Sequence, residues 1–140
     1  MILVVDASVA IKWFLHLKAD EEDADRALRI LAGAVSARHV LIQPPHFVAE
    51  VAAVLAREKP RDAQADLADL LNIEFQHADN PEIYAKATEL AVRRQHHIFD
   101  TLYHAVALCT PGATLVTADR RYFDKARGEG NIIMLADLVA

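Results

Sequence analysis

The chain has 140 residues, a formal net charge of −5 at pH 7 and one cysteine. This length suits one compact domain with one core, so we expect a single domain over residues 1–140. One cysteine excludes an internal disulfide and a multi-cysteine zinc site. The negative charge argues against a protein that coats nucleic acid, but it is compatible with an enzyme whose carboxylates bind cations.

The N-terminal segment is apolar but does not resemble a signal peptide, because it lacks a basic leader and is interrupted by Asp6 and Lys12. No stretch reaches the roughly 20 uninterrupted apolar residues that a membrane-spanning helix needs. We therefore expect a cytoplasmic protein without membrane contacts.

Strand-like and helix-like segments alternate along the whole chain. In the N-terminal half we expect a strand at Ile2–Val5, helices at Ser8–Leu17 and Glu21–Ala34, a strand at Val40–Gln43, and helices at Pro44–Glu58 and Arg61–Leu71. In the C-terminal half we expect a strand at Ile73–Phe75, helices at Pro81–Gln95 and Asp100–Cys109, a strand at Ala113–Thr117, a helix at Asp119–Arg127 and a strand at Ile132–Leu135. This alternation predicts a three-layer α/β/α sandwich with a central parallel sheet of about five strands.

Two aspartates directly follow predicted strands. Asp6 comes after Ile2–Val5, and Asp119 comes after the apolar run at Leu115–Ala118. Open α/β sheets bind ligands beyond the carboxyl ends of their strands, which is where both side chains would lie. Each aspartate also precedes a predicted helix, so either one could serve only as an N-cap.

Glu50 and Asp100 are two further carboxylates in apolar surroundings. Glu50 lies at the edge of the apolar stripe of its helix, and a buried carboxylate needs a partner such as a metal ion or an arginine. Asp100 begins the most hydrophobic predicted helix, where it could again be an N-cap. If Asp6, Glu50, Asp100 and Asp119 converge, their oxygen-rich cluster suits Mg²⁺ or Mn²⁺. Two such ions about 4 Å apart can activate a water and stabilise the leaving oxygen of a phosphodiester.

Four segments of the sequence resemble the PIN-domain ribonucleases, and most closely the VapC-type toxins of toxin–antitoxin pairs. These segments are MILVVDASVAIKWF, FVAEVAAVLARE, FDTLYHAVAL and LVTADRRYFDKA, which cover almost the whole chain in the usual order. The resemblance implies that Asp6, Glu50, Asp100 and Asp119 are the acidic catalytic and metal-binding residues of the family. It further assigns supporting positions to Ser8, Thr117 and Asp124, although the spacing of Asp124 also suits a solvated helix face.

The resemblance also implies a biochemical role. Such proteins cut tRNA, rRNA or mRNA with Mg²⁺, which Mn²⁺ can replace, and are commonly homodimers blocked by a separate VapB-type antitoxin. Arg120 and Arg121 directly follow Asp119, so they could position the RNA backbone, pair with an antitoxin carboxylate or form surface salt bridges.

We considered three other functions for this sequence. A housekeeping PIN nuclease in RNA maturation would share the chemistry without the toxin role. An aspartyl-phosphate phosphotransfer protein would use Asp6 as its acceptor, but the related phosphatases need a second aspartate where Ser8 stands. A non-catalytic interaction protein on the same fold is disfavoured because all four carboxylates are present.

The adjacent histidines His96 and His97 invite a metal-binding interpretation. Neighbouring positions on a helix face different directions, so we expect no chelating pair here. The preference of histidine for the C-terminal end of a helix is the simpler explanation.

Overall fold

The structure is a computed structural model that describes residues 1–15 and 22–139. Its centre is a five-stranded parallel sheet with the strand order β3-β2-β1-β4-β5. The strands are β1 (Ile2–Val5), β2 (Val40–Gln43), β3 (Gln76–His77), β4 (Ala113–Thr117) and β5 (Ile132–Met134). The predicted parallel sheet is therefore confirmed, and β1, β2 and β4 have the predicted bounds.

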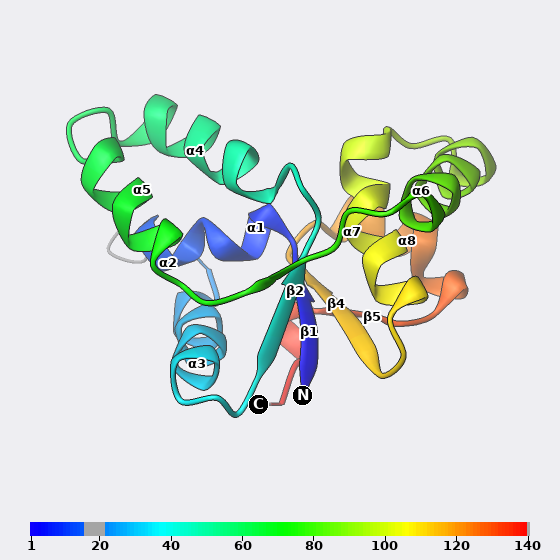
Figure 1. The fold of residues 1–140 in the computed structure, drawn as a ribbon, viewed down its shortest axis with the longest axis horizontal. Coiled ribbons are helices and arrows are strands. Elements are labelled where there is room, and N and C mark those ends of the chain that lie inside the picture. Colours follow the sequence, from blue (N-terminus) through cyan, green and yellow to red (C-terminus); the bar gives the residue numbers. More distant parts are fainter. Residues whose placement is uncertain (16–21, 140) are drawn as a thin grey trace.

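Helices cover both faces of this sheet, as Figure 1 shows. The helices on one side are α1 (Ala7–Ala10), α2 (Lys12–Leu15), α3 (Ala24–Val35), α4 (Phe47–Glu58) and α5 (Ala63–Leu71). Those on the other side are α6 (Pro81–Arg94), α7 (Ile98–Cys109) and α8 (Arg120–Ala126). Short 3-10 turns follow at Arg127–Glu129 and Leu135–Asp137. The three-layer α/β/α prediction is confirmed, and no helix in the described residues is long and apolar enough to cross a membrane.

Several predicted bounds differ from the structure, among them the starts of the helices expected from Pro44 and Arg61, which begin at Phe47 and Ala63. The helix expected over Ser8–Leu17 is broken at Ile11 into α1 and α2, and its predicted end lies outside the described residues. The helix expected from Glu21 begins at Ala24. The strand expected at Ile73–Phe75 is wrong, because these residues are a connection after α5 and the pairing with β2 starts at Gln76.

The Ile73–Phe75 connection uses its apolar side chains for packing instead of sheet pairing. Ile73 and Phe75 are partly buried against the core, and the ring of Phe75 meets that of Phe47 edge to face at 5.5 Å. Such packing explains why Ile73 and Phe75 are apolar although they do not belong to a strand.

The most buried helix is α7, which lies against the sheet and has every residue from Thr101 to Ala107 buried. Its hydrophobic sequence is explained by this central place in the core. Its N-terminal end is nevertheless at the surface, where Phe99 is 56% exposed, so polar residues of its first turn can meet solvent.

Gln43 completes the hydrogen bonding of β1 where the backbone of β2 no longer does so. The register of β1 and β2 pairs Ile2 with Val40 and Leu3 with Leu41. Beyond these pairs, the buried Gln43 side chain accepts from Val5 N at 2.8 Å and donates to Val5 O at 2.7 Å. The amide thus replaces a peptide unit and fixes the last residue of β1, immediately before Asp6.

Candidate active site

Asp6 and Asp119 lie at the ends of neighbouring strands. β1 and β4 are paired in the sheet, and the chain leaves them in opposite directions across it, so this is the point where the strand order reverses. Both aspartates also cap the helix that follows. The carboxylate of Asp6 accepts from Ser8 N at 3.3 Å, and Asp119 Oδ1 accepts from Tyr122 N at 3.1 Å. Their predicted placement at strand ends and their predicted capping are both confirmed.

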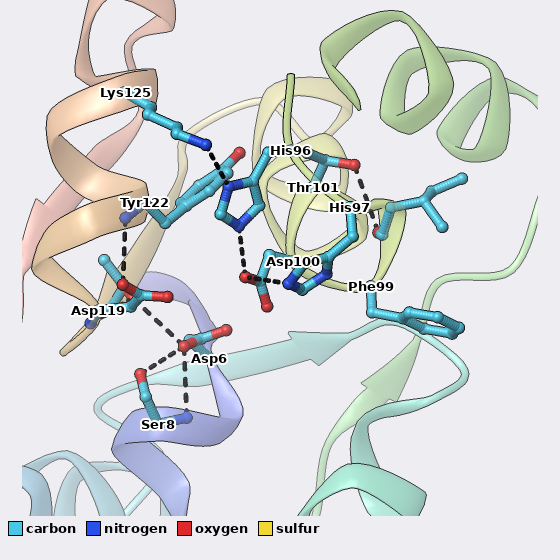
Figure 2. A network of polar contacts seen from close by, with 12 residues as sticks. Asp6, Ser8, His96, His97, Phe99, Asp100, Thr101, Asp119, Tyr122 and Lys125 are labelled. Carbon is cyan, nitrogen blue, oxygen red and sulfur yellow. Dashed lines mark hydrogen bonds and ion pairs between the residues drawn. The ribbon is translucent and has the colours of Figure 1, made fainter. Parts of the chain in front are cut away.

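Two hydroxyl groups connect these strand ends. Ser8 Oγ donates to Asp6 Oδ2 and accepts from Ala118 N at 3.0 Å. Thr117 Oγ1 donates to Asp6 Oδ2 at 3.3 Å and accepts from Asp119 N at 3.0 Å. Each hydroxyl therefore spans from the carboxylate of Asp6 to the backbone next to Asp119, and Figure 2 shows the contacts of Asp6 and Asp119 in one network. Ser8 and Thr117 thus hold the two strand ends in a fixed relation.

Glu50 reaches the same region from α4. Tyr103 of α7 donates its hydroxyl to Glu50 Oε1 at 2.7 Å, and His46 Nε2 lies 3.3 Å from the same oxygen. The sequence left open whether an arginine or a metal ion would partner Glu50. In the described part of the chain its recorded partners are a phenol and an imidazole, neither of which offers the permanent charge of an arginine.

Asp100 is not the N-cap of α7, which corrects the capping interpretation. The helix begins at Ile98 and His97 occupies the cap position, so Asp100 lies within the first turn. Its Oδ2 atom is 2.6 Å from His96 Nε2 and 3.2 Å from His97 Nε2, as Figure 2 shows. Asp100 is therefore held by two imidazoles, which the sequence interpretation did not foresee.

The pKa of Asp6 is raised to about 7, mainly by burial and in addition by the nearby carboxylates of Asp100 and Glu50, while the hydrogen bonds from Ser8 oppose the shift. Burial likewise raises the pKa of Tyr103, with added contributions from Glu50, Asp6 and Asp100. Asp6, Glu50 and Asp100 thus share one electrostatic environment. The backbone N–H of Asp119 is linked to the Asp6 carboxylate through the Thr117 hydroxyl. We call these four residues the acidic site.

The acidic site fits a divalent cation by its chemistry. A buried carboxylate whose pKa is raised by other carboxylates lacks a compensating positive charge, and a cation would supply it. Carboxylate and hydroxyl oxygens are the donors that Mg²⁺ and Mn²⁺ prefer. Within the described ranges, the acidic and histidine side chains that bring three ligand atoms within 4.8 Å of one another are His96, His97 and Asp100. Among the described residues, the four carboxylates do not themselves bring three ligand atoms this close together, but one of them, Asp100, does so with two histidines.

The remaining predicted residues lie on the exposed part of α8. Asp124 is 59% exposed and its Oδ1 atom is 3.9 Å from Arg120 Nη1. The guanidinium of Arg120 also lies 5.7 Å from the ring centre of Phe123, and Arg121 is exposed. These contacts agree with the solvated-face interpretation of Asp124 and leave both arginines accessible to a partner.

A large cavity lies away from the acidic site. It has a volume of about 590 Å³ and is lined by residues of α2, α3 and α5, among them Trp13, Phe14 and Asp66. None of the four carboxylates lines it. The four carboxylates therefore lie apart from this cavity, after β1 and β4 and on α4 and α7.

Tyr103, His46 and Gln43 support this site but were missed from the sequence. Their roles depend on contacts between segments distant in the chain, such as Tyr103 of α7 with Glu50 of α4. Gln43 carried one signal, because it is a polar residue at the end of an apolar strand. A long-range contact of this kind has no signature in local spacing.

Together, the fold and its carboxylates define an open α/β domain with an acidic site at the switch point of a parallel sheet. The model of the PIN domain family matches residues 3–129. The chain belongs to the PIN domain family. Proteins of this family are nucleases, which supports hydrolysis of phosphodiester bonds as the activity of this chain. No curated protein sequence matches the chain.

Several solved structures share this fold. PAE2754 from Pyrobaculum aerophilum matches with a TM-score of 0.66 and 21% identity, covering 96% of this chain and 89% of that one. VapBC2 from Rickettsia felis, solved with a DNA fragment from its promoter, matches with a TM-score of 0.64 and 18% identity over 96% of this chain and 97% of that one. VapC20 from Mycobacterium tuberculosis, a toxin that cleaves the sarcin-ricin loop, matches with a TM-score of 0.57 and 20% identity over 76% of this chain and 81% of that one.

Proposed function

We propose that the protein is an endoribonuclease that depends on Mg²⁺ or Mn²⁺ and acts as the toxin of a toxin–antitoxin pair. The proposed nuclease activity rests on the buried carboxyl group of Asp6 at the end of β1, which shares one electrostatic environment with Glu50 and Asp100. Membership of the PIN domain family supports the same class of reaction.

In this proposal Asp6, Glu50, Asp100 and Asp119 hold the cation. A bound divalent ion supplies a water activated for attack and stabilises the leaving oxygen of the phosphodiester. Ser8 and Thr117 orient Asp6, because each donates a hydroxyl to its Oδ2 atom. Tyr103 fixes Glu50 by donating to its Oε1 atom, and His46 Nε2, which contacts Phe99 O at 2.6 Å, lies 3.3 Å from the same oxygen. The exposed Arg120 and Arg121 offer positive charge to the phosphates of RNA.

The toxin role is supported by the kind of proteins that share this fold. The structure from Rickettsia felis is a VapBC assembly, and so is VapBC-1 from nontypeable Haemophilus influenzae, which matches 98% of this chain with a TM-score of 0.62 and 16% identity. We propose a VapB-type antitoxin as the partner, a homodimer as the assembly, a single domain as the organisation and the cytoplasm as the location. Co-expression with the neighbouring upstream reading frame tests the proposed antitoxin, since cells survive expression of a toxin only when its antitoxin is present.

The decisive experiment on the nuclease compares Asp6→Asn and Asp119→Asn with the unmodified chain. Both variants should lose Mg²⁺-dependent cleavage of a mixed RNA substrate by about 100-fold or more, because each removes a proposed metal ligand from a preorganised site. The circular dichroism spectrum should stay unchanged, because the amide preserves the side-chain shape.

Asp25→Asn is the matched control, since Asp25 is 77% exposed on α3 and paired with Arg29. It should cleave like the unmodified chain. Full cleavage by both Asp6→Asn and Asp119→Asn would refute the proposal.

A further inference from the structure

His96 and His97 lie outside any helix, contrary to the sequence interpretation. Helix α6 ends at Arg94, and Gln95 follows in the left-handed region with φ 51°. His97 has extended backbone with φ −75° and ψ 149° before α7 begins. The change of backbone direction between these residues lets adjacent side chains point to the same side. Their rings accordingly stack at 4.6 Å with an interplanar angle of 30°.

Both imidazoles converge on one carboxylate oxygen. His96 Nε2 is 2.6 Å and His97 Nε2 is 3.2 Å from Asp100 Oδ2. Figure 2 shows that both rings contact this one oxygen. The three ligand atoms lie within 4.8 Å of one another, which is the span of ligands around one ion. The side chain of His96 is 7% exposed and that of His97 is 62% exposed, so the group has one buried and one open side.

We propose that His96, His97 and Asp100 bind one transition-metal ion of the Zn²⁺ class through two imidazole Nε2 atoms and one carboxylate oxygen. Imidazole nitrogens favour Zn²⁺, Co²⁺ and Ni²⁺, whereas Mg²⁺ prefers oxygen ligands alone. Three protein ligands leave the fourth tetrahedral position to water, and the exposed His97 provides the opening for it. The site is thus chemically distinct from the all-oxygen acidic site, and its existence does not depend on the proposed function.

Lys125 contacts the ring nitrogen of His96 that faces away from Asp100. Its Nζ lies 3.2 Å from His96 Nδ1 and 3.1 Å from Gln95 O. An ammonium only donates, so in the metal-free chain Nδ1 accepts from Lys125 and the ring proton lies on Nε2, facing Asp100 Oδ2. Ligation through Nε2 therefore requires the ring proton to move to Nδ1, where the ammonium would face a donor and keep only its bond to Gln95. An outer acceptor at Nδ1 normally strengthens a ligating histidine. Lys125→Gln, which offers an amide oxygen, should therefore tighten ion binding severalfold, and weaker or unchanged binding would refute ligation through Nε2.

The test is a titration of the full chain, freed of any histidine tag and stripped of metal with a chelator. Co²⁺ is the spectroscopic probe, because its visible absorption reports the coordination geometry, and calorimetry with Zn²⁺ gives the dissociation constant. Loss of an outer-shell partner costs about 10–100-fold in metal affinity, so loss of a ligand should cost at least that. His96→Gln and His97→Gln should each weaken Zn²⁺ and Co²⁺ binding by about tenfold or more.

Two variants serve as controls. His77→Gln changes an exposed histidine at the sheet edge on β3 and should bind both ions like the unmodified chain. Asp6→Asn should also retain binding, because Asp6 is not a ligand of this group. Equal affinity in His97→Gln and the unmodified chain, absence of binding by the unmodified chain, or an equal loss in Asp6→Asn would each overturn the proposal. Because His97 is exposed, its variant is informative even if His96→Gln fails to fold.

A consequence for activity rests on the proposed function. Asp100 belongs to both sites, so an ion held by the imidazoles competes with Mg²⁺ for this carboxylate. Zn²⁺ should then inhibit Mg²⁺-dependent RNA cleavage, and His97→Gln should need about tenfold more Zn²⁺ for the same inhibition. If the chain cleaves no RNA, the titration still decides on the imidazole site.

Discussion

The two sides of the acidic site are built in different ways. On the strand side, Asp6 and Asp119 follow paired strands and are held by backbone N–H groups and by Ser8 and Thr117. On the helix side, Glu50 and Asp100 project from α4 and α7 and are held by aromatic and imidazole side chains. The strand side depends on sheet register, which many sequences can maintain. The helix side depends on particular aromatic and histidine side chains. It can therefore have properties that the fold alone does not determine.

The largest expected effect concerns Asp6 and the pH dependence of stability. Its pKa rises from 3.8 to about 7 in the folded chain, so between these values the native state keeps a proton that the unfolded state has lost. In the metal-free protein, the stability from this proton is fully present below about pH 4 and lost as the pH rises to about 7. The slope should approach about 1.4 kcal/mol per pH unit.

Urea denaturation in the presence of a chelator measures this slope. Asp6→Asn should flatten it, and Mg²⁺ should stabilise the unmodified chain most above pH 7, where binding no longer displaces a proton. Asp25→Asn is again the matched control. A pH dependence that survives Asp6→Asn unchanged would contradict the assignment of the raised pKa to Asp6.

An intermediate effect should distinguish the helix side from the strand side. Tyr103→Phe removes the donor to Glu50 and should lower Mg²⁺-dependent cleavage by about 10–100-fold, with more Mg²⁺ needed for half activation. Thr117→Val should cost less than tenfold, because Ser8 still donates to Asp6. Steady-state cleavage over a range of Mg²⁺ concentrations measures both.

Tyr84→Phe is the control for the loss of a phenol, since Tyr84 is exposed on α6 and bonded to Asp79. It should leave the Mg²⁺ requirement unchanged. A larger loss in Thr117→Val than in Tyr103→Phe would reverse the comparison and make the strand side the more sensitive one.

The smallest effect is expected at Asp124. Its carboxylate is exposed and loosely paired with Arg120, and such surface pairs contribute little to stability. Asp124→Asn should change cleavage by less than about twofold and the free energy of unfolding by less than about 0.5 kcal/mol. A tenfold loss of cleavage would instead add Asp124 to the acidic site.

Most of the sheet was predictable because all its strands except β3 are largely apolar runs with clear ends, whereas β3 consists of Gln76 and His77. β1 and β4 follow this rule, and the two aspartates after them could be placed by chain order alone. The strand at Ile73–Phe75 was wrong because apolar residues that alternate with a polar one can also pack from a connection, as Phe75 does against Phe47. Local pattern does not distinguish these two uses of apolar residues.

The helix side of the site was less predictable. Glu50 could be singled out because a carboxylate stands at the edge of an apolar stripe, but its partner Tyr103 is 53 positions away. His96 and His97 were misread because helix geometry was applied to them, whereas α6 ends at Arg94, Gln95 is left-handed and His97 has extended backbone. In such a connection the side chains of adjacent residues can point to the same side, which the helical spacing rule does not allow for.

The Gln43 amide has a consequence for local motion. The N–H group of Val5 donates its hydrogen bond to a side chain and not to the backbone of a neighbouring strand. A rotation about the Gln43 side-chain torsions therefore releases this amide while β1 stays paired with β4 through Val116. Hydrogen exchange at Val5 thus proceeds by a local route that exchange in the middle of the strand does not share. The residue before Asp6 becomes a reporter of side-chain fluctuation at the rim of the acidic site, separable from global unfolding.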